Sequence, residues 1–460
     1  MNFKGSVRAS DTISAGLATV RLSFDAWKEG NVQPTTLTLS VLPPKPPPKS
    51  EPISPAWKKT LPHPDPNGIV FSLKYSGDGK RLFTSGYPSG IVQFWDVDSG
   101  REILRIDTPA GYRGSGEYAF LNHDWSMLYV ATEDRNAVPI ERDGQKLRRL
   151  EYTGRIRRWD LRTKQELAPW VPPRGRGNVF ARIIHEGRYI LSRERFSSLN
   201  TERNRIATVL WDTATGEPIE LGEGDLDVEF SADGRQMIVA QNDPPTKTTQ
   251  VRLLTFPERQ VLHQWEHRSD DGRSPRVLGH SPASHALVLQ LVGKKGAEPT
   301  LIFLNTENLT EIGRWTGSPD PGSYGWMNGR FTPDGKWFVF FNGKDSLHVW
   351  DIGRRQVVRS IPWKHPVSWS SEFTPDGRWL AIPWMPPADK KISSDPNADP
   401  TDLPQPRVTL IDLQNPKAEP VTFIAPHGYV GGFAIRPDGK QLAFGSRGCF
   451  HLFDLTGIGE

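Results

Sequence analysis

The chain contains little cysteine and no long apolar run. Cys449 is the only cysteine in 460 residues, so no disulfide can form within the chain. No apolar stretch is long enough to span a bilayer, and residues 1–20 lack the continuous apolar segment of a signal peptide. These absences exclude a disulfide framework and a helical membrane protein, so we expect a cytoplasmic protein that does not bind a membrane.

The signature motifs of common enzymes are missing as well. The chain has no H-E-x-x-H or paired C-x-x-C metal motif, no P-loop and no G-x-S-x-G nucleophile elbow. Its eleven histidines are scattered along the sequence. We therefore predict no catalytic residues, no cofactor, no cofactor-binding residues and no metal ligands, and a protein that is not an enzyme.

Glycine and proline, in contrast, are abundant. The chain holds 42 glycines and 41 prolines with a hydrophobic content of 36%, which is typical of many short strands joined by many turns. No segment shows the apolar period of a convincing helix. The composition therefore predicts an all-β fold.

A Trp-Asp pair near the end of a short apolar run recurs along the chain. Eight copies follow one another at intervals of 42 to 64 residues, and a self-similar unit of this length is a repeat signature. Four copies are complete and four have decayed. The complete pairs are Trp95-Asp96, Trp159-Asp160, Trp211-Asp212 and Trp350-Asp351, and the decayed ones are Leu254-Thr255, Leu304-Asn305, Ile411-Asp412 and Phe453-Asp454.

Each unit predicts four short strands. Segments such as "YSGDGKRLFTSG" and "FTPDGKWFVFFN" precede the pair and indicate two strands with a tight turn between them, because Gly accepts a positive φ and Asp hydrogen-bonds its own backbone. A second turn and a fourth apolar run follow the pair, as in "DVDSGREILRI". A small sheet with two apolar faces cannot bury them alone, so we expect the units to stack around a closed ring.

These units resemble the WD40 repeat family, in the divergent form of bacterial chains, over residues 56–460. The resemblance implies a single eight-bladed β-propeller of four-stranded antiparallel blades, in which the Trp-Asp pairs are structural. A seven-bladed ring is the alternative, because unit five lacks both its Asp-Gly turn and its Trp-Asp pair. The Gly-His dipeptide of the family occurs only as Gly279-His280, and its hydrogen-bond tetrad is reduced to Asp345 and Trp350 in unit six.

The eighth unit ends just past its third strand, at "HLFDLTGIGE". Its missing fourth strand is predicted far upstream, because residues 56–63, "AWKKTLPH", form a strand-like segment ahead of unit one. We infer that this segment pairs with unit eight and closes the ring, which removes exposed sheet edges.

The chain is predicted to comprise three segments. Residues 1–41 alternate apolar and polar residues and predict two strands joined by a turn, either a β-hairpin extension or the remnant of a truncated β domain. Residues 42–55, which contain "LPPKPPPKSEP", predict a proline-rich linker. Residues 56–460 predict the propeller.

Positive charge is concentrated in one window. The net charge of the whole chain is +4, but residues 141–205 hold 15 Arg and 2 Lys against 8 Asp and Glu, a net charge of +9. Such a window suits an acidic partner, nucleic acid or an anionic surface. The simpler interpretation, which we favour, is that exposed strands and loops need charge and that arginine stems cover apolar surface.

Long insertions are predicted on one rim of the ring. The loops between the second and third strands are long in units two (132–154), three (193–205), four (241–249) and seven (384–406). They share a rim with the links between blades, and repeat proteins often bind on the face that collects insertions. Tolerated drift of loop length is the alternative. The candidate contact residues are Arg148, Arg149, Arg155, Arg195, Tyr87, Tyr152, Phe196 and Trp384.

These features favour a monomeric, non-catalytic scaffold that binds protein partners through the loop-rich rim. One alternative is a propeller enzyme, similar to sugar lactonases, with a metal or cofactor in the central channel. Such a site needs acidic residues in the innermost strands, but none cluster there in the sequence, and the exceptions are Glu117, Asp227, Glu229 and Glu372. The other alternative is binding of an acidic partner through residues 141–205, with nucleic acid as the less favoured ligand.

Overall fold

In the computed structural model the chain divides into two compact units, Met1–Ser54 and Pro55–Glu460. In the first unit, β1 (Gly16–Arg21) and β2 (Thr36–Val41) pair antiparallel as the predicted hairpin. The structure describes residues 16–21, 36–41, 57–65, 68–87, 89–108, 119–142, 145–173, 179–197, 204–224, 226–243, 246, 248–268, 274–292, 296–318, 327–342, 345–365, 371–386, 406–424 and 431–458.

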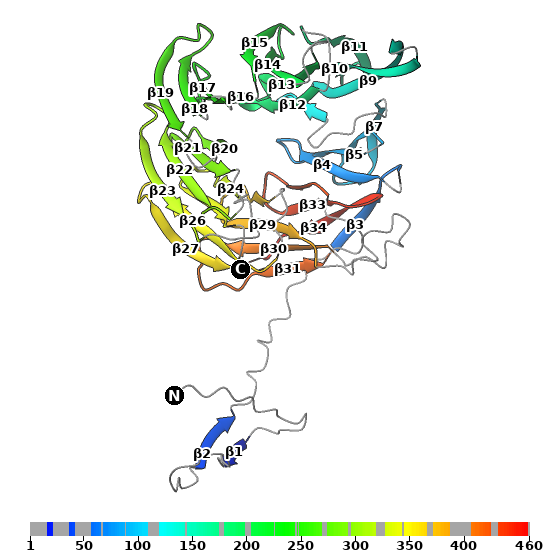
Figure 1. The fold of residues 1–460 in the computed structure, drawn as a ribbon. Helices are drawn as coiled ribbons and strands as arrows, with labels where there is room; N and C mark the ends of the chain where they lie inside the picture. Colours follow the sequence, from blue (N-terminus) through cyan, green and yellow to red (C-terminus); the bar gives the residue numbers. More distant parts are fainter. Residues whose placement is uncertain are drawn as a thin grey trace. The chain divides into compact units, whose positions relative to one another are not determined.

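The second unit is an eight-bladed β-propeller, which confirms eight blades over seven. Each blade is a four-stranded antiparallel sheet, and Figure 1 shows the blades following one another around a ring. Blade one consists of β4 (Ile69–Tyr75), β5 (Arg81–Tyr87), β6 (Ile91–Asp96) and β7 (Glu102–Asp107), and blade two of β8 (Ala119–Leu121), β9 (Met127–Arg142), β10 (Gln145–Asp160) and β11 (Gln165–Trp170). Blade three consists of β12 (Val179–Ile184), β13 (Tyr189–Ser197), β14 (Asn204–Asp212) and β15 (Pro218–Glu223), and blade four of β16 (Leu226–Phe230), β17 (Gln236–Asp243), β18 (Thr248–Thr255) and β19 (Val261–Arg268).

The degenerate unit five is a complete blade as well. The only helix among the described residues is the short 3-10 turn η1 (His185–Gly187), and none in these ranges is long and apolar enough to cross a membrane. Blade five consists of β20 (Ser274–Ser281), β21 (Ala286–Val292), β22 (Thr300–Asn305) and β23 (Glu311–Thr316), and blade six of β24 (Asn328–Phe331), β25 (Trp337–Phe341), β26 (Ser346–Asp351) and β27 (Gln356–Pro362). Blade seven consists of β28 (Glu372–Phe373), β29 (Trp379–Trp384), β30 (Arg407–Asp412) and β31 (Val421–Ile424), and blade eight of β32 (Phe433–Ile435), β33 (Gln441–Gly445), β34 (Cys449–Asp454) and β3 (Trp57–Pro62).

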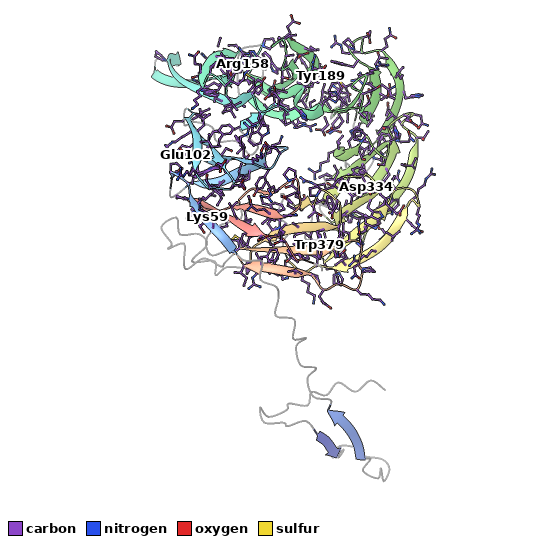
Figure 2. All side chains as sticks on the ribbon, turned by 180° about the vertical axis from the view of Figure 1, so that it is seen from behind. Lys59, Glu102, Arg158, Tyr189, Asp334 and Trp379 are labelled. Carbon is purple, nitrogen blue, oxygen red and sulfur yellow. The ribbon has the colours of Figure 1, made fainter. Side chains whose placement is uncertain are left out.

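The ring closes as the sequence predicts. β3 pairs antiparallel with β34 from Trp57↔Phe453 to Pro62↔Cys449 and forms the outermost strand of blade eight. A second connection joins blade eight to blade one near their inner strands, because the Val70 amide donates to the Ser446 carbonyl at 3.0 Å and the Val70 carbonyl accepts from Gly432 at 3.0 Å. Figure 2 labels Lys59 on this closing strand, where its ammonium donates to the Ser99 carbonyl at 3.1 Å. The seam between the first and last blades is therefore held on both its inner and outer sides.

The hydrophobic core consists of eight separate clusters. Each cluster combines residues of two adjacent blades, so every seam of the ring has its own core. Between blades two and three, for example, Tyr129 and Trp170 of one blade pack against Trp211 of the next. The apolar faces that a single blade leaves uncovered are buried in this way by its neighbours.

The Trp-Asp pairs end the third strands and serve two purposes. The four tryptophans are at most 6% exposed. Three of their rings contact an aromatic ring of the preceding blade: Trp95 with Phe450, Trp211 with Trp170, and Trp350 with Phe303. The four aspartates each accept a hydrogen bond at 2.8 Å from a backbone N–H of the turn that follows, those of Ser99, Arg162, Ala214 and Arg354.

Polar support of the tryptophans is reduced to single bonds. The Trp95 indole N–H donates to Thr84 Oγ1 at 3.1 Å, and the Trp211 indole N–H donates to Ser192 Oγ at 2.9 Å. Each acceptor lies on the second strand of the same blade, across the ladder from the tryptophan. These two blades thus keep a tryptophan–hydroxyl bond and rely on apolar packing for the rest of the seam.

Candidate functional site

Among the described residues, one hairpin stands out on the rim that carries the second-to-third strand connections. β9 and β10 of blade two have 16 residues each, whereas the second and third strands of the other blades have no more than nine. Their pairing is continuous from Met127↔Asp160 to Gln145↔Arg142. Figure 1 shows these two strands in teal. The predicted loop at 132–154 is therefore wrong, because these residues continue the two strands.

The outer part of this hairpin is a two-stranded ribbon. β8 pairs with β9 only as far as Val130, and β11 pairs with β10 only as far as Ile156. Ala131 and Ile156 are buried in the core between blades two and three. Beyond them, no other strand in the described ranges pairs with either edge. We call residues 132–142 and 145–155 the ribbon.

The predicted loops of blades three and four are shortened in the same manner. In blade three the strands continue to Ser197 and resume at Asn204, and in blade four they continue to Asp243 and resume at Thr248. In blade seven β29 ends at Trp384 and β30 begins at Arg407, and residues 387–405 lie outside the described residues. In blades two, three and four, the described rim is thus uneven because the strands differ in length.

The candidate contact residues fall on four blades. Arg148, Arg149, Tyr152 and Arg155 share the ribbon on β10, opposite Pro139, Val138, Arg135 and Thr132 of β9. Arg195 and Phe196 lie on β13, Tyr87 ends β5 and Trp384 ends β29. The structure describes the backbone of all eight residues, but it describes the side chains of only two of them, Arg155 and Trp384. The ribbon is the one place where several candidates come together.

Trp384 is a core residue rather than an exposed anchor. Its side chain is 5% exposed and belongs to the core between blades six and seven. The indole N–H donates to Thr409 Oγ1 at 2.9 Å, and the His365 ring stacks on it with 3.6 Å between centroids. Trp384 is not an exposed contact residue because, at the end of the second strand of blade seven, it is covered by the seam with blade six.

The basic window is largely accounted for by contacts within the fold wherever its side chains are described. Arg158, which Figure 2 labels, donates to the Ala168 carbonyl at 2.7 Å and lies over the Trp170 ring. Arg155 is half-buried. Five more arginines of the window form ion pairs, namely Arg157 with Glu166, Arg162 with Asp160, Arg182 with Glu229, Arg188 with Asp212, and Arg193 with Asp227.

Two acidic residues of the inner strands, Asp227 and Glu229, form ion pairs across the seam between blades three and four. Glu229 accepts hydrogen bonds from both terminal nitrogens of Arg182 at 3.1 Å, and Asp227 accepts a hydrogen bond from Arg193 at 2.5 Å. Burial raises the pKa of Glu229, and the nearby Arg182 opposes this shift. Glu117 lies outside the described residues. No group of three or more His, Cys, Asp or Glu side chains in the described ranges is placed to hold a metal ion.

His280, the histidine of the Gly279-His280 dipeptide, is buried beside this pair. It lies within β20 rather than in a turn, and its side chain is 5% exposed, with Nδ1 3.9 Å from Glu229 Oε2. Burial lowers its pKa from 6.5 to about 4, and His285 adds to the shift. The ring is therefore neutral at pH 7.

Acidification should destabilise the propeller through His280. The unfolded chain binds a proton near pH 6.5 but the folded chain only near pH 4, so the stabilisation is complete above pH 6.5 and is lost between pH 6.5 and 4. The loss is roughly 3 kcal/mol. Urea unfolding at pH 7 and pH 4.5 should show a smaller pH-dependent loss in His280→Asn than in the wild type, whereas the same change at exposed His123 should leave the pH-dependent loss unaltered.

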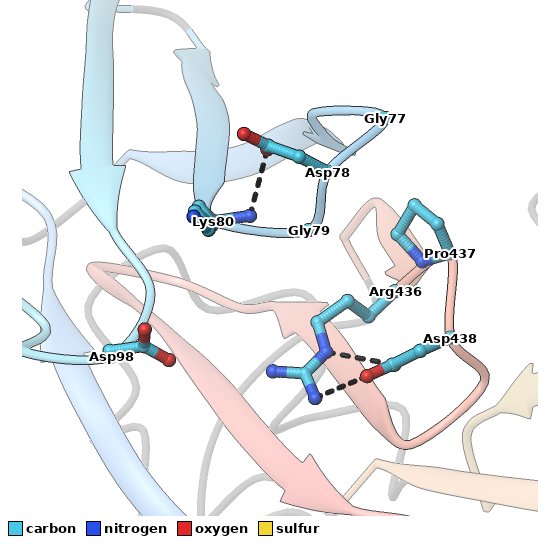
Figure 3. Close-up of a pocket in the computed structure, with 8 residues that line it drawn as sticks. All are labelled: Gly77, Asp78, Gly79, Lys80, Asp98, Arg436, Pro437 and Asp438. Atoms are coloured by element: carbon cyan, nitrogen blue, oxygen red, sulfur yellow. Dashed lines mark hydrogen bonds and ion pairs between the residues drawn. The ribbon is translucent and has the colours of Figure 1, made fainter.

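A cleft of about 420 Å³ lies on the opposite rim, between blades one and eight (Figure 3). On the blade-eight side, Arg436 and Asp438 of one turn form a two-pronged ion pair with contacts of 2.8 and 2.5 Å, and on the blade-one side Asp78 accepts the Lys80 N–H at 3.0 Å. These bonds stabilise the two Asp-Gly turns. The lining residues are Gly77, Asp78, Gly79, Lys80, Asp98, Arg436, Pro437 and Asp438.

Comparison with known proteins agrees with this architecture. No family model and no curated protein sequence matches the chain. Among solved structures, the crystal structure of the C-terminal WD40 domain of Sif2 is similar, with a TM-score of 0.55 and 14% sequence identity over 87% of this chain and 99% of that domain. The likeness at this identity concerns the fold, and the chain therefore has the eight-bladed propeller fold of a WD40 domain.

Proposed function

We propose that this protein is a non-catalytic scaffold that binds other proteins through the rim bearing the ribbon. WD40 propellers commonly act as protein-interaction scaffolds. The observation that carries the proposal is the ribbon itself, which extends two strands beyond the core of their blade and leaves both edges without a pairing strand in the described residues. Open edges are costly because they promote aggregation, so a ribbon of this kind is best explained by a partner that uses it.

The remainder of the ring supports a frame that does not deform on binding. Eight cores, one at each seam, and the double connection between blades eight and one hold the blades together. A rigid frame lowers the entropic cost of binding, because the contact surface is already ordered.

Excision of the ribbon tests this function directly. Replacing residues 133–154 with Asn-Gly would join Thr132 to Arg155, which are already paired, through a two-residue turn. We expect capture of protein partners to fall by about tenfold or more, equivalent to about 1.4 kcal/mol, while the thermal unfolding curve stays the same. Quantitative affinity capture with cross-linking measures the first effect, and calorimetry measures the second.

A matched control shortens another connection on the same rim. Replacing residues 244–247 with Asn-Gly alters the hairpin of blade four, where β17 is paired with β16 as far as Gln241 and β18 is paired with β19 from Thr248 to Leu254. This variant should keep every partner. If the ribbon-less protein also keeps every partner, the proposed binding surface is wrong.

A further inference from the structure

The two edges of the ribbon differ in their capacity to bind another strand. Arg142 pairs with Gln145, which leaves two residues between them, and the pair that flanks a two-residue hairpin loop exchanges hydrogen bonds. Pairs alternate from there, so Pro139↔Arg148 is a pair whose backbone groups face outward. Proline fits this position because the hydrogen bonds between β9 and β10 do not need an N–H from residue 139.

Pro139 therefore removes a donor from the outer edge of β9. A proline on an edge strand is a common device against pairing with another chain. β10 has no proline between Gln145 and Arg155, so its outer edge keeps an unbroken series of donors and acceptors. The edge of β10 is consequently the one suited to an added strand.

Charge distinguishes the two edges in the same sense. Residues 145–155 hold four basic residues and one acidic residue, a net charge of +3, whereas residues 132–142 hold two basic and three acidic residues, a net charge of −1. Like charges on neighbouring strands are destabilising, so β10 favours an acidic neighbour over a basic one. The eleven residues of this edge span about 35 Å at the rise of a β-strand.

We infer that the edge of β10 between Gln145 and Arg155 binds an acidic, extended segment of a partner protein by β-strand addition. Main-chain hydrogen bonds would supply affinity and the charge difference would supply selectivity. This inference rests on the proposed function and specifies the partner segment.

The test uses a fluorescein-labelled ten-residue peptide of alternating glutamate and valine, titrated with the full chain and followed by fluorescence anisotropy. We expect saturable binding that weakens as salt is raised. A peptide of alternating lysine and valine should bind at least about tenfold more weakly.

Two proline variants form a matched pair. Leu150 and Ala137 are paired with each other and face outward on opposite edges, so a proline at either position leaves the bonds between β9 and β10 intact. Leu150→Pro should weaken peptide binding by about tenfold or more, and Ala137→Pro should change it by less than about twofold. Arg148→Glu combined with Arg149→Glu provides a second route to the same loss without any backbone change.

Several outcomes would overturn the inference. Equal effects of the two proline variants would mean that edge pairing is not the mode of binding. Tighter binding of single-stranded DNA than of the peptide, or a dimer of the chain that Leu150→Pro dissolves, would assign the edge to a different occupant. If excision of the ribbon abolishes capture of partners but Leu150→Pro does not, the scaffold function stands and strand addition is wrong.

Discussion

Replacing Trp211 with alanine should lower the free energy of unfolding by about 3–5 kcal/mol. The side chain is 2% exposed and stacks on Trp170 of blade two with 5.4 Å between ring centroids and 4° between ring planes. The variant would leave a large cavity at the seam between blades two and three. It would also leave the fully buried Ser192 hydroxyl without the indole donor. Urea unfolding followed by tryptophan fluorescence and circular dichroism measures the loss.

The matched control is Trp211→Phe, which keeps most of the ring volume and loses the N–H. It should cost about 1–2 kcal/mol, the value of a hydrogen bond plus a small volume change. An alanine variant that loses less than the phenylalanine variant would show that this seam relaxes around the cavity, contrary to the packing described.

Removing the closing strand should have an effect of similar or greater size. A chain that begins at residue 64 lacks β3, and β34 then presents an unpaired edge along its length. The five register pairs between these strands, at about 1 kcal/mol for each hydrogen bond, and the burial of Leu61 together contribute on the order of 5 kcal/mol. We expect a much lower unfolding temperature and association through the open edge.

A chain that begins at residue 55 is the control for this truncation. It removes the first compact unit and keeps β3, so its propeller should unfold as in the full chain. Calorimetry and sedimentation compare the two truncations. If the chain from residue 64 remains as stable and monomeric as the chain from residue 55, then the inner connection at Val70 and Gly432 closes the ring without β3.

The fold could be predicted from sequence because three of the four decayed units, those of Asn305, Asp412 and Asp454, keep the hydrogen bond of the turn. In unit five the Trp-Asp pair is Leu304-Asn305, yet Asn305 Oδ1 accepts the Glu307 N–H at 2.7 Å, as the aspartates do elsewhere. The missing Asp-Gly turn is replaced by one in which His285 takes a positive φ of 48°. Blade five therefore lacks the residue motifs of the repeat but keeps the hydrogen bonds of its turns.

The ribbon was missed for a physical reason. Residues 132–154 carry no alternation of apolar and polar residues, which is the pattern from which strands are predicted. One signal was present, the Asp143-Gly144 dipeptide, which is a strong marker of a two-residue hairpin turn. Trp384 was predicted to be exposed but is buried. It packs in the core between blades six and seven and stacks on His365, which lies in the link between these blades.

The inner-strand charges could not be paired from sequence either. Arg182 and Glu229 are separated by 47 residues and meet only because consecutive blades place their first strands side by side. No spacing rule predicts such a contact, since the intervals between units vary from 42 to 64 residues.

Closure by β3 and β34 also sets the order in which the molecule can be completed during synthesis. Thr60 and His451, which hydrogen-bond across these strands, are 391 residues apart. At a translation rate of roughly 5–20 residues per second, β3 waits about 20 to 80 seconds for its partner. The early blades can stack on one another as they emerge, but blade eight forms only after the ribosome has released residues 449–454. Throughout that interval the nascent chain carries an unsatisfied strand, which is a natural point for chaperone binding.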